Sequence, residues 1–291
     1  MKIVNLLGGL GNQMQEYAFS LALKKHYPNE EILLDIQHLE SLYEHGFEIK
    51  KVFPNLDCKI ATKKQINKVS RYVPNYKLSR IVRRLLPKKR TEYVEARESD
   101  IFDSKVFDLQ GDVYYEGYWH AYKYYEDIIP EIRSSFVPTD ANEYNAGLIN
   151  DIEKENSVGI HVRRGDYLQA ENASLAGACN LDYYKAAISE LYKHGSDYHF
   201  YIFSNDIDWC KKEILPLLKT DKVTFVTGNT GIHSCWDMFL MSHCKKLIIA
   251  NSSFSWWGAM LNKNNPTVIV PKYWRVGDSS ESFCAPDWIR L

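Results

Sequence analysis

The feature that most constrains the fold is a regular alternation of short apolar runs and helically patterned segments in the second half of the chain. The apolar runs have strand length and lie at residues 158–162, 198–203, 223–226, 246–250 and 267–270. Between them, apolar residues recur at helical spacing, which predicts helices at 182–193, 206–218 and 233–243 and a fourth starting near Ser253. Strands joined by helical crossovers form a parallel, doubly wound sheet.

The first half of the chain begins with the same pattern. We expect strands at 3–7, 31–35 and 113–118 and helices at 12–26 and 122–136, with a looser pattern from residue 40 to residue 110. Polar and turn-forming residues cluster at 138–145, which indicates a boundary between domains at 1–142 and 143–291. The expected fold class is therefore α/β, with two Rossmann-type domains.

Bulk composition excludes several classes of protein. The net charge of −1 favours no binding to nucleic acid, and no run of eighteen apolar residues predicts a transmembrane helix. The six cysteines form no C-x-x-C pair, and no signal peptide precedes the first strand. These features predict a cytoplasmic protein with reduced thiols.

Two arginines follow the strand at 158–162, in the run from His161 to Tyr167 that reads HVRRGDY. Ligands bind at the carboxyl edge of a parallel sheet, and a guanidinium group pairs bidentately with phosphate. We therefore predict that Arg163 binds phosphate and that His161 contacts the ligand without acting as a base. The alternative is an ordinary surface loop with an arginine–aspartate ion pair.

Two more polar segments follow predicted strands. Asp206 ends the run Ser204-Asn205-Asp206, where it could read a guanine edge or cap the next helix. Asp206-x-Asp208 also matches a metal-binding pattern, but capping is the favoured interpretation, and no metal site is expected. In the run NSSFSWWGA the hydroxyl and amide groups at a helix N-terminus suit a diphosphate, which predicts binding by Ser252, Ser253, Phe254 and Ser255. Trp256 and Trp257 fit the core, although one of them could stack on a ligand.

A glycine-rich turn, Gly8-Gly9-Leu10-Gly11, connects the first strand to the first helix. Gly9 and Gly11 would let the backbone approach a ligand, and the amides of Asn12 and Gln13 would grip its hydroxyl groups. The turn matches only part of a dinucleotide-binding fingerprint, whose third glycine is replaced by Met14, although Asp35 stands where a ribose-binding acid would lie.

Together these motifs resemble those of family 11 glycosyltransferases, the α-1,2-fucosyltransferases. The shared elements are HVRRGDY, FSND, NSSFSWWGA and the amino-terminal GGLGNQM. The resemblance implies a GT-B-like fold in which two Rossmann-type domains face each other across a cleft. Residues 1–142 would form the acceptor side, and residues 143–291 would bind GDP-β-L-fucose.

The implied reaction transfers fucose with inversion to the 2-hydroxyl of a galactose in a glycan, without a metal or any other cofactor. The family usually has Phe-Gln after the first motif, whereas this chain has Gln15-Glu16, which would place an extra negative charge near the cleft. The chain resembles a bacterial enzyme acting on a capsule or O-antigen precursor, with an acceptor that could be lipid-linked.

The acceptor hydroxyl must lose a proton in such a transfer. Glu171 lies ten residues after His161, an interval at which related α-1,6-fucosyltransferases carry a glutamate that resembles a base. Asp166 is the second candidate, but pairing with the arginines would lower its pKa. Asn12 resembles an asparagine of the protein O-fucosyltransferases and would orient the nucleophile.

Residues 63–90 contain eleven Lys or Arg and no acid, with apolar residues near helical spacing. Such a basic amphipathic segment could bind weakly to an anionic membrane or could simply pack on its own domain. For the whole chain, two other functions remain open: a nucleotide-sugar-binding module without turnover, and an NAD-type enzyme that uses the glycine turn.

Overall fold

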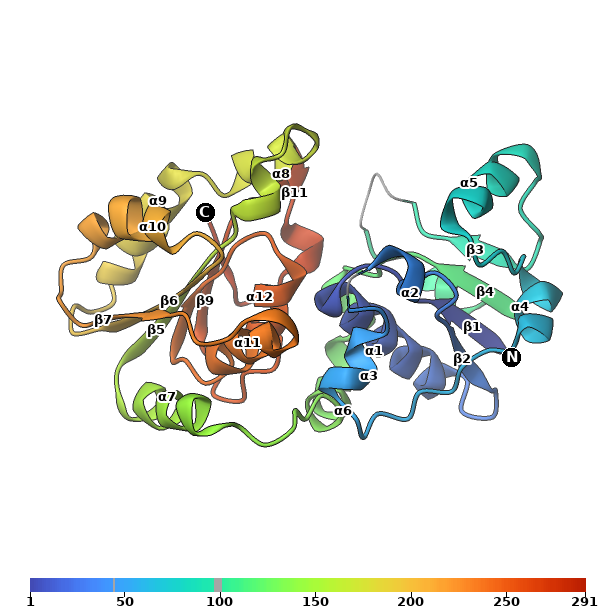
Figure 1. The fold of residues 1–291 in the computed structure, drawn as a ribbon, viewed down its shortest axis with the longest axis horizontal. Coiled ribbons are helices and arrows are strands. Elements are labelled where there is room, and N and C mark those ends of the chain that lie inside the picture. The colour runs from blue at the N-terminus through green and yellow to red at the C-terminus, as the bar shows by residue number, and fades with distance from the viewer. Residues whose placement is uncertain (44, 97–100) are drawn as a thin grey trace. The chain divides into compact units, whose positions relative to one another are not determined.

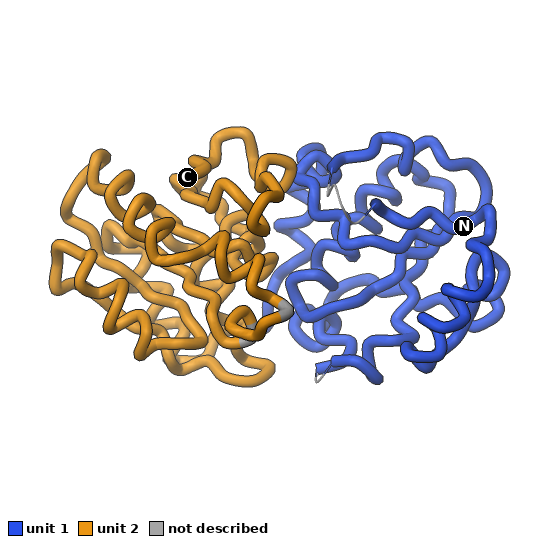
Figure 2. The backbone as a smooth tube through the Cα atoms, turned by 90° about the horizontal axis from the view of Figure 1, so that it is seen from above, with its two compact units in different colours: residues 1–139 blue, residues 140–291 orange. Residues whose placement is uncertain are grey.

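The computed structural model describes residues 1–43, 45–96 and 101–291, with the backbone alone at Asp166 and Glu171. The chain divides into two compact units, unit 1 at Met1–Thr139 and unit 2 at Asp140–Leu291 (Figure 2). The division falls three residues before the predicted boundary at 142/143.

Unit 2 is built on a six-stranded parallel sheet with the order β12-β9-β8-β5-β6-β7. Numbered within the unit, this is the 3-2-1-4-5-6 order of the doubly wound dinucleotide-binding fold. The strands are β5 (Ser157–Val162), β6 (His199–Ser204), β7 (Val223–Val226), β8 (Lys246–Ile248), β9 (Thr267–Val270) and β12 (Ile289–Arg290). The last of these was not predicted, because two residues are too short for a recognisable apolar run.

Helices cover both faces of this sheet, with α9 and α10 on one side and α7, α11 and α12 on the other (Figure 1). Their bounds are α7 (Glu143–Lys154), α8 (Ala173–Ala178), α9 (Leu181–Tyr192), α10 (Ile207–Trp209), α11 (Cys235–Met241) and α12 (Ser253–Met260). A short hairpin, β10 (Tyr273–Arg275) with β11 (Asp278–Ser279), completes the unit.

Helix α9 shows why this packing follows from the sequence. Its buried side chains form one stripe that packs on the apolar face of β5 and β6: Tyr183, Tyr184, Ala187, Ile188 and Leu191. Burying each such side chain contributes about 1.5–3 kcal/mol, so the stripe fixes the helix to the sheet.

Unit 1 contains a four-stranded parallel sheet with the order β2-β1-β4-β3. The strands are β1 (Lys2–Asn5), β2 (Ile32–Asp35), β3 (Glu92–Val94) and β4 (Val113–Glu116). The helices are α1 (Leu10–His26), α2 (Leu39–Leu42), α3 (Glu48–Val52), α4 (Lys63–Val69), α5 (Tyr76–Leu85) and α6 (Ile129–Ser135). No described helix has the length and apolar character that crossing a bilayer requires.

Three predicted helices are shorter or less regular than expected. The segment predicted at 206–218 is a short α10 followed by a π turn (Cys210–Ile214) and a 3-10 turn (Leu215–Leu217), and Pro216 lacks the amide that would continue an α-helix. The segment at 233–243 begins with a 3-10 turn before α11, and the segment at 122–136 is helical in the α form only at Ile129–Ser135.

The basic segment at 63–90 is also two helices rather than one. Thr62 caps α4 and Asn75 caps α5, each through a side-chain oxygen that accepts a backbone N–H three residues ahead. In α4 the apolar residues Ile66 and Val69 are buried, as expected for a helix that packs on its own domain. In α5 the only buried residue is Ser79, so its apolar residues are not packed in this way.

Candidate functional site

The carboxyl ends of β5 and β8 form the topological switch point of the unit 2 sheet. These two strands are neighbours, but β5 connects through α9 to β6 on one side and β8 connects through α12 to β9 on the other. Ligands of open α/β sheets bind in the crevice at such a point. The sequence motifs around Arg163 and Asn251 follow these two strands, so the fold brings them to the same edge.

A hydrogen bond joins the two loops. The hydroxyl of Tyr167, in the loop after β5, donates to the carbonyl oxygen of Asn251, in the loop after β8, at 2.9 Å. The Arg163 guanidinium lies over the Tyr167 ring, 5.9 Å from its centroid. Arg163 thus lies on a ring whose hydroxyl binds the loop that leads into α12, although the sequence analysis assigned no role to Tyr167.

The second arginine of the pair is occupied differently. Arg164 Nε donates to Asp206 Oδ2 at 3.0 Å, its guanidinium covers the Trp209 ring at 4.3 Å, and its backbone N–H donates to Asn205 Oδ1 at 2.9 Å. Gly165 accommodates this arrangement, because a Cβ there would lie 2.3 Å from Asn205 Nδ2. Arg164 therefore ties the β5 and β6 loops together.

Asp206 caps α10, which is the alternative that the sequence offered beside binding of a guanine edge. Its Oδ1 accepts the backbone N–H of Trp209 at 3.1 Å while its Oδ2 binds Arg164, and Asp208 lies in the first turn of the helix. Each oxygen keeps acceptor capacity, and the side chain is 31% exposed. Across the part of the chain that the structure describes, no three His, Cys, Asp or Glu side chains form a group that could hold a metal ion.

His161 is buried at the end of β5. Burial first, and the charge of Arg163 second, lower the pKa of His161 to about 3, so the ring is neutral at physiological pH. Its Nδ1 is buried without a hydrogen-bond partner among the described residues, and its ring lies 5.8 Å from that of Phe254. Buried polar atoms are nearly always satisfied by protein, water or ligand, so this nitrogen retains the capacity for one hydrogen bond.

The N-terminus of α12 presents backbone donors rather than a side-chain cap. Ser252 is the N-cap residue, yet its side chain makes no capping hydrogen bond, and the Ser255 hydroxyl donates to the carbonyls of Ala250 and Ser252. The amide of Asn251 donates to the carbonyls of Leu175 and Trp274, while its buried Oδ1 has no partner among the described residues. Uncapped N–H groups at a helix N-terminus favour an anion.

Trp256 and Trp257 are both fully buried, which places them in the core and removes them from any stacking role at the surface. Trp256 Nε1 donates to the carbonyl of Phe283, and the two indole rings pack edge to face. The tryptophans thus anchor α12 behind the site.

In unit 1 the glycine turn lies at the carboxyl end of β1. Gly8 has a φ of +88°, and a Cβ on it would lie 2.5 Å from Asn12 Nδ2. Gly9 is the N-cap residue of α1, and its carbonyl accepts the backbone N–H groups of Asn12 and Gln13. Gly8, which was not among the predicted site residues, is therefore the one that fixes the turn and the position of Asn12.

The prediction that Gln13 grips ligand hydroxyls is wrong. Its side chain is fully buried, its Nε2 donates to the carbonyls of Gly8 and Gly46, and its Oε1 accepts the N–H of Ile49. Gln13 holds the glycine turn against the segment that leads into α3. Helical periodicity alone could not reveal this, because all three partners of the amide are backbone groups, and Gly46 and Ile49 lie far from Gln13 in the sequence.

Asp35, which stands where the ribose-binding acid of a dinucleotide fingerprint would lie, has a structural role instead. Its Oδ2 accepts from the Tyr114 hydroxyl at 2.8 Å, Gln37 donates to both of its oxygens, and the side chain is fully buried. Burial raises the pKa of Asp35. A carboxyl group that is satisfied inside its own unit cannot bind the ribose of a dinucleotide.

Glu16 does not place an exposed charge near a binding site. Its Oε2 accepts the N–H of Leu7 at 2.8 Å, and the side chain is buried. Burial raises the pKa of Glu16 well above its usual value, while the hydrogen bond from Leu7 acts in the opposite direction. The departure from Phe-Gln is thus a change in how the glycine turn is supported.

A loop after β4 went unrecognised in the sequence. Glu95 Oε2 accepts the backbone N–H groups of Tyr118 and Trp119 at 2.8 and 2.9 Å, and Trp119 takes a φ of +54°. The buried Trp119 ring stacks on Phe19 of α1 at 3.9 Å. This loop lies at the end of the strand beside β1, so it shares a sheet edge with the glycine turn.

Asp166 and Glu171, the two predicted candidates for the base, have side chains outside the described residues. Their backbone belongs to two 3-10 turns, Gly165–Leu168 and Ala170–Asn172, that lead from β5 into α8.

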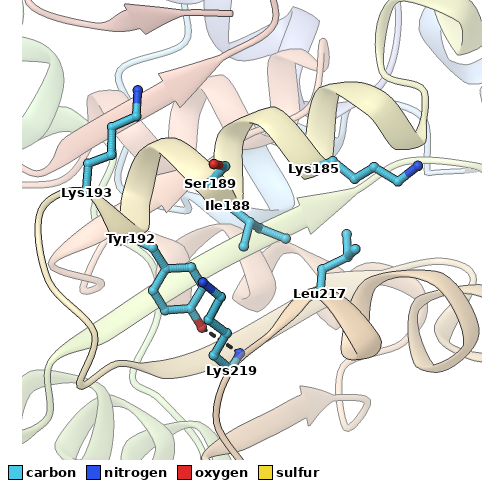
Figure 3. Close-up of a pocket in the computed structure, with 7 residues that line it drawn as sticks. All are labelled: Lys185, Ile188, Ser189, Tyr192, Lys193, Leu217 and Lys219. Carbon is cyan, nitrogen blue, oxygen red and sulfur yellow. Dashed lines mark hydrogen bonds between the residues drawn. The ribbon is translucent and has the colours of Figure 1, made fainter.

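A pocket of about 350 Å³ opens elsewhere on unit 2, between α9 and the segment at 217–219 (Figure 3). It is lined by Lys185, Ile188, Ser189, Tyr192, Lys193, Leu217 and Lys219. None of the predicted site residues lines it.

Comparison with known proteins identifies the family. The family model described as "Glycosyl transferase family 11" matches residues 1–291. The chain is 34% identical to an alpha-1,2-colitosyltransferase of Escherichia coli, over 99% of this chain and 98% of that protein. It is 29% identical to the O-antigen biosynthesis glycosyltransferase WbnK of Escherichia coli, over 98% and 99% of the two chains.

Among solved structures, the fucosyltransferase NodZ from Bradyrhizobium is similar with a TM-score of 0.51 and 14% identity, covering 89% of this chain and 92% of that chain. This likeness concerns the fold, which is the two-domain α/β class predicted from the sequence. With a family match over its full length, the chain belongs to glycosyltransferase family 11.

Proposed function

We propose that this glycosyltransferase transfers L-fucose from GDP-β-L-fucose to the 2-hydroxyl of a galactose residue, with inversion, to give an α-1,2 linkage. The observation that carries the donor assignment is the link at the switch point between β5 and β8, where Arg163 lies over Tyr167 and the Tyr167 hydroxyl binds Asn251 in the loop that leads into α12. An arginine and the backbone N–H groups of a helix N-terminus suit a diphosphate.

The leaving diphosphate gains charge as the bond to the sugar breaks. Arg163 would stabilise that charge, together with backbone N–H groups at Ser253, Phe254 and Ser255 and the hydroxyl of Ser252. A site of this kind supports the reaction without a metal ion.

Asp206 would accept hydrogen bonds from the guanine edge, because it lies at the end of β6 and each carboxylate oxygen keeps acceptor capacity. Arg164 holds its orientation. His161 would contact the donor through its Nδ1, which has no partner among the described residues.

The acceptor would bind on the side of unit 1. Gly9 and Gly11 would let the backbone of the turn approach the ligand, and Asn12 would orient the acceptor hydroxyl. Glu171 would receive its proton, with Asp166 as the second candidate, because a base must lie in the loop beside the reacting sugar.

We further propose that the acceptor is a bacterial surface-glycan precursor presented on a lipid carrier at the cytoplasmic face of the membrane. Support comes from WbnK, whose name places it in O-antigen biosynthesis.

A second donor has specific support. The alpha-1,2-colitosyltransferase of Escherichia coli is 34% identical over nearly the whole chain, and colitose differs from fucose by the absence of the 3-hydroxyl. An enzyme that hydrogen-bonds this hydroxyl rejects the deoxy sugar strongly, whereas one that does not bind it accepts both donors.

Measurement of GDP release with GDP-fucose and with GDP-colitose, across a panel of galactose-terminated acceptors, separates these donors. Calorimetric titration with GDP and NAD tests the remaining alternatives. Binding of NAD would support a nicotinamide enzyme. The buried hydrogen bonds of Asp35 and Gln13 within unit 1 argue against that function. Binding of GDP-fucose without turnover on any acceptor would support a binding module.

A further inference from the structure

Helix α5 carries a stripe of large apolar side chains on its outer surface. Leu78, Ile81 and Leu85 recur at intervals of three and four residues, and they are 51%, 54% and 74% exposed. Leu86, directly after the helix, is 48% exposed. Monomeric proteins rarely expose contiguous apolar surface on one helix without a binding role.

The opposite side of α5 is the one that faces unit 1. Ser79 is buried, the Tyr76 ring packs edge-on against His38 at 5.4 Å, and Arg83 forms an ion pair with Glu116 of β4. At 100° per residue, Leu78, Ile81 and Leu85 lie more than a quarter-turn away from this packed side. Figure 1 shows α5 at the periphery of unit 1, next to the edge strand β3.

Cations accompany the apolar stripe. Lys77, Arg80 and Arg84 are exposed on the arc between the stripe and the packed side, and none of them forms an ion pair with a described residue. Around the helix, the order is therefore a packed side, a basic stripe and an apolar stripe. Long basic side chains can reach toward lipid headgroups while the apolar stripe enters the acyl boundary.

The arrangement of charges on α5 indicates whether a second copy of the chain or a lipid bilayer covers the apolar stripe. A second copy of α5 would bring Lys77, Arg80 and Arg84 against their equivalents, which is unfavourable. Three apolar side chains on a ten-residue helix, with Leu86 directly after it, also bury much less than the roughly 800 Å² per partner of a stable interface. An anionic bilayer needs no such area, since each cation near the surface adds attraction and each leucine or isoleucine buries apolar area.

We propose that α5 is a membrane-contacting helix that lies on an anionic lipid surface, with Leu78, Ile81, Leu85 and Leu86 inserted and Lys77, Arg80 and Arg84 at the headgroups. The purpose of this contact rests on the proposed lipid-linked acceptor. The contact itself requires no turnover, so it is tested separately from the reaction.

The experiment uses the full-length chain and sedimentation with vesicles of phosphatidylcholine containing about one-third phosphatidylglycerol, and with phosphatidylcholine alone. Two triple variants test the two stripes separately. L78S/I81S/L85S removes the apolar stripe, and K77E/R80E/R84E removes the basic stripe. The matched charge control is K211E/K212E/K263E, which changes exposed lysines of unit 2 by the same amount. Circular dichroism checks folding, and GDP release with a water-soluble galactoside reports catalysis.

We expect the wild-type chain and the unit 2 control to bind the anionic vesicles, with binding weakened by high salt. Each α5 triple variant should bind at least about tenfold more weakly, while catalysis on the soluble acceptor is unchanged. The proposal is overturned if wild type does not bind anionic vesicles at low salt, or if both α5 variants bind as well as wild type. If the wild-type chain shows no activity on the water-soluble galactoside, that result counts against the proposed reaction and leaves the membrane contact untouched.

Discussion

The Tyr167 hydroxyl and the Asn251 carbonyl, 2.9 Å apart, connect the loops that leave β5 and β8. This bond crosses the switch point of the sheet and lies beside the Arg163 guanidinium. The loop that carries Arg163 and the loop that begins α12 therefore have a fixed relative position before any ligand binds. Preorganised donors stabilise a developing charge without the cost of reorganisation during the reaction.

Replacement of Arg163 by lysine should reduce kcat more than donor affinity. Lysine keeps the positive charge but loses the planar fork that pairs with a diphosphate. Loss of one preorganised donor typically lowers kcat by about 10²–10³. The measurement is kcat together with the Kd of GDP-fucose, and Arg164→Lys is the comparison, in which donor affinity should fall more than kcat because Arg164 orients Asp206. A near-normal kcat in Arg163→Lys would exclude Arg163 from stabilising the leaving group.

The two adjacent glycines of the amino-terminal turn should respond differently to alanine. Gly8→Ala should lower the free energy of unfolding by about 2 kcal/mol or more, because its φ is +88° and the new Cβ would collide with Asn12. At Gly9 a Cβ would have no atom within 4 Å, so Gly9→Ala should cost less than about 1 kcal/mol. Urea denaturation compares the two variants, and equal destabilisation would contradict this description of the turn.

His161 should make the protein less stable in mild acid. The folded chain has a pKa of about 3 at this residue and the unfolded chain the usual 6.5, so below pH 6.5 the unfolded chain binds a proton that the folded chain does not. This contribution to stability is complete above pH 6.5 and falls as the pH drops toward 3.

Between pH 7.5 and 5.0 the wild-type chain should lose about 2 kcal/mol more than His161→Gln. Urea unfolding at the two pH values measures the difference, and His233→Gln, at an exposed position, is the matched control. The same loss in wild type and in His161→Gln would mean that His161 is protonated in the folded chain.

Glu171→Gln should lower kcat by about 10²–10⁴ with donor affinity intact, as expected for loss of a general base. Asp166→Asn provides the comparison, because Asp166 lies nearer to the arginines in the sequence. The assignment fails if Glu171→Gln keeps full kcat while Asp166→Asn loses it and still binds GDP.

The parts of the fold that the sequence predicted are those with local periodic signals. Strands β7 and β9 lie at the predicted residues, and the apolar residues that recur at helical spacing in α9 are buried. Long-range polar contacts were beyond such signals. The sequence shows amides at Asn12 and Gln13. It does not show that the Gln13 side chain forms hydrogen bonds with the backbone of Gly8, Gly46 and Ile49.

The candidate donor site was predictable because its residues follow strands, and parallel strands deliver their carboxyl ends to one edge. The residue pattern gave no physical reason to choose Arg163 over Arg164, since the difference depends on Asp206 and Trp209 from the next strand and helix, which bind Arg164. The exposed side of α5 was not predictable either, because an amphipathic pattern does not say which stripe faces the protein.

The most direct test of the central claim is the reaction of GDP-β-L-fucose with a β-galactoside in the presence of EDTA, followed by NMR assignment of the product. The account predicts GDP release without added metal and a single product with an α-fucosyl group on O2 of galactose, lost in Arg163→Lys. Transfer that requires Mn²⁺ or Mg²⁺, or a product linked at another hydroxyl, would contradict it.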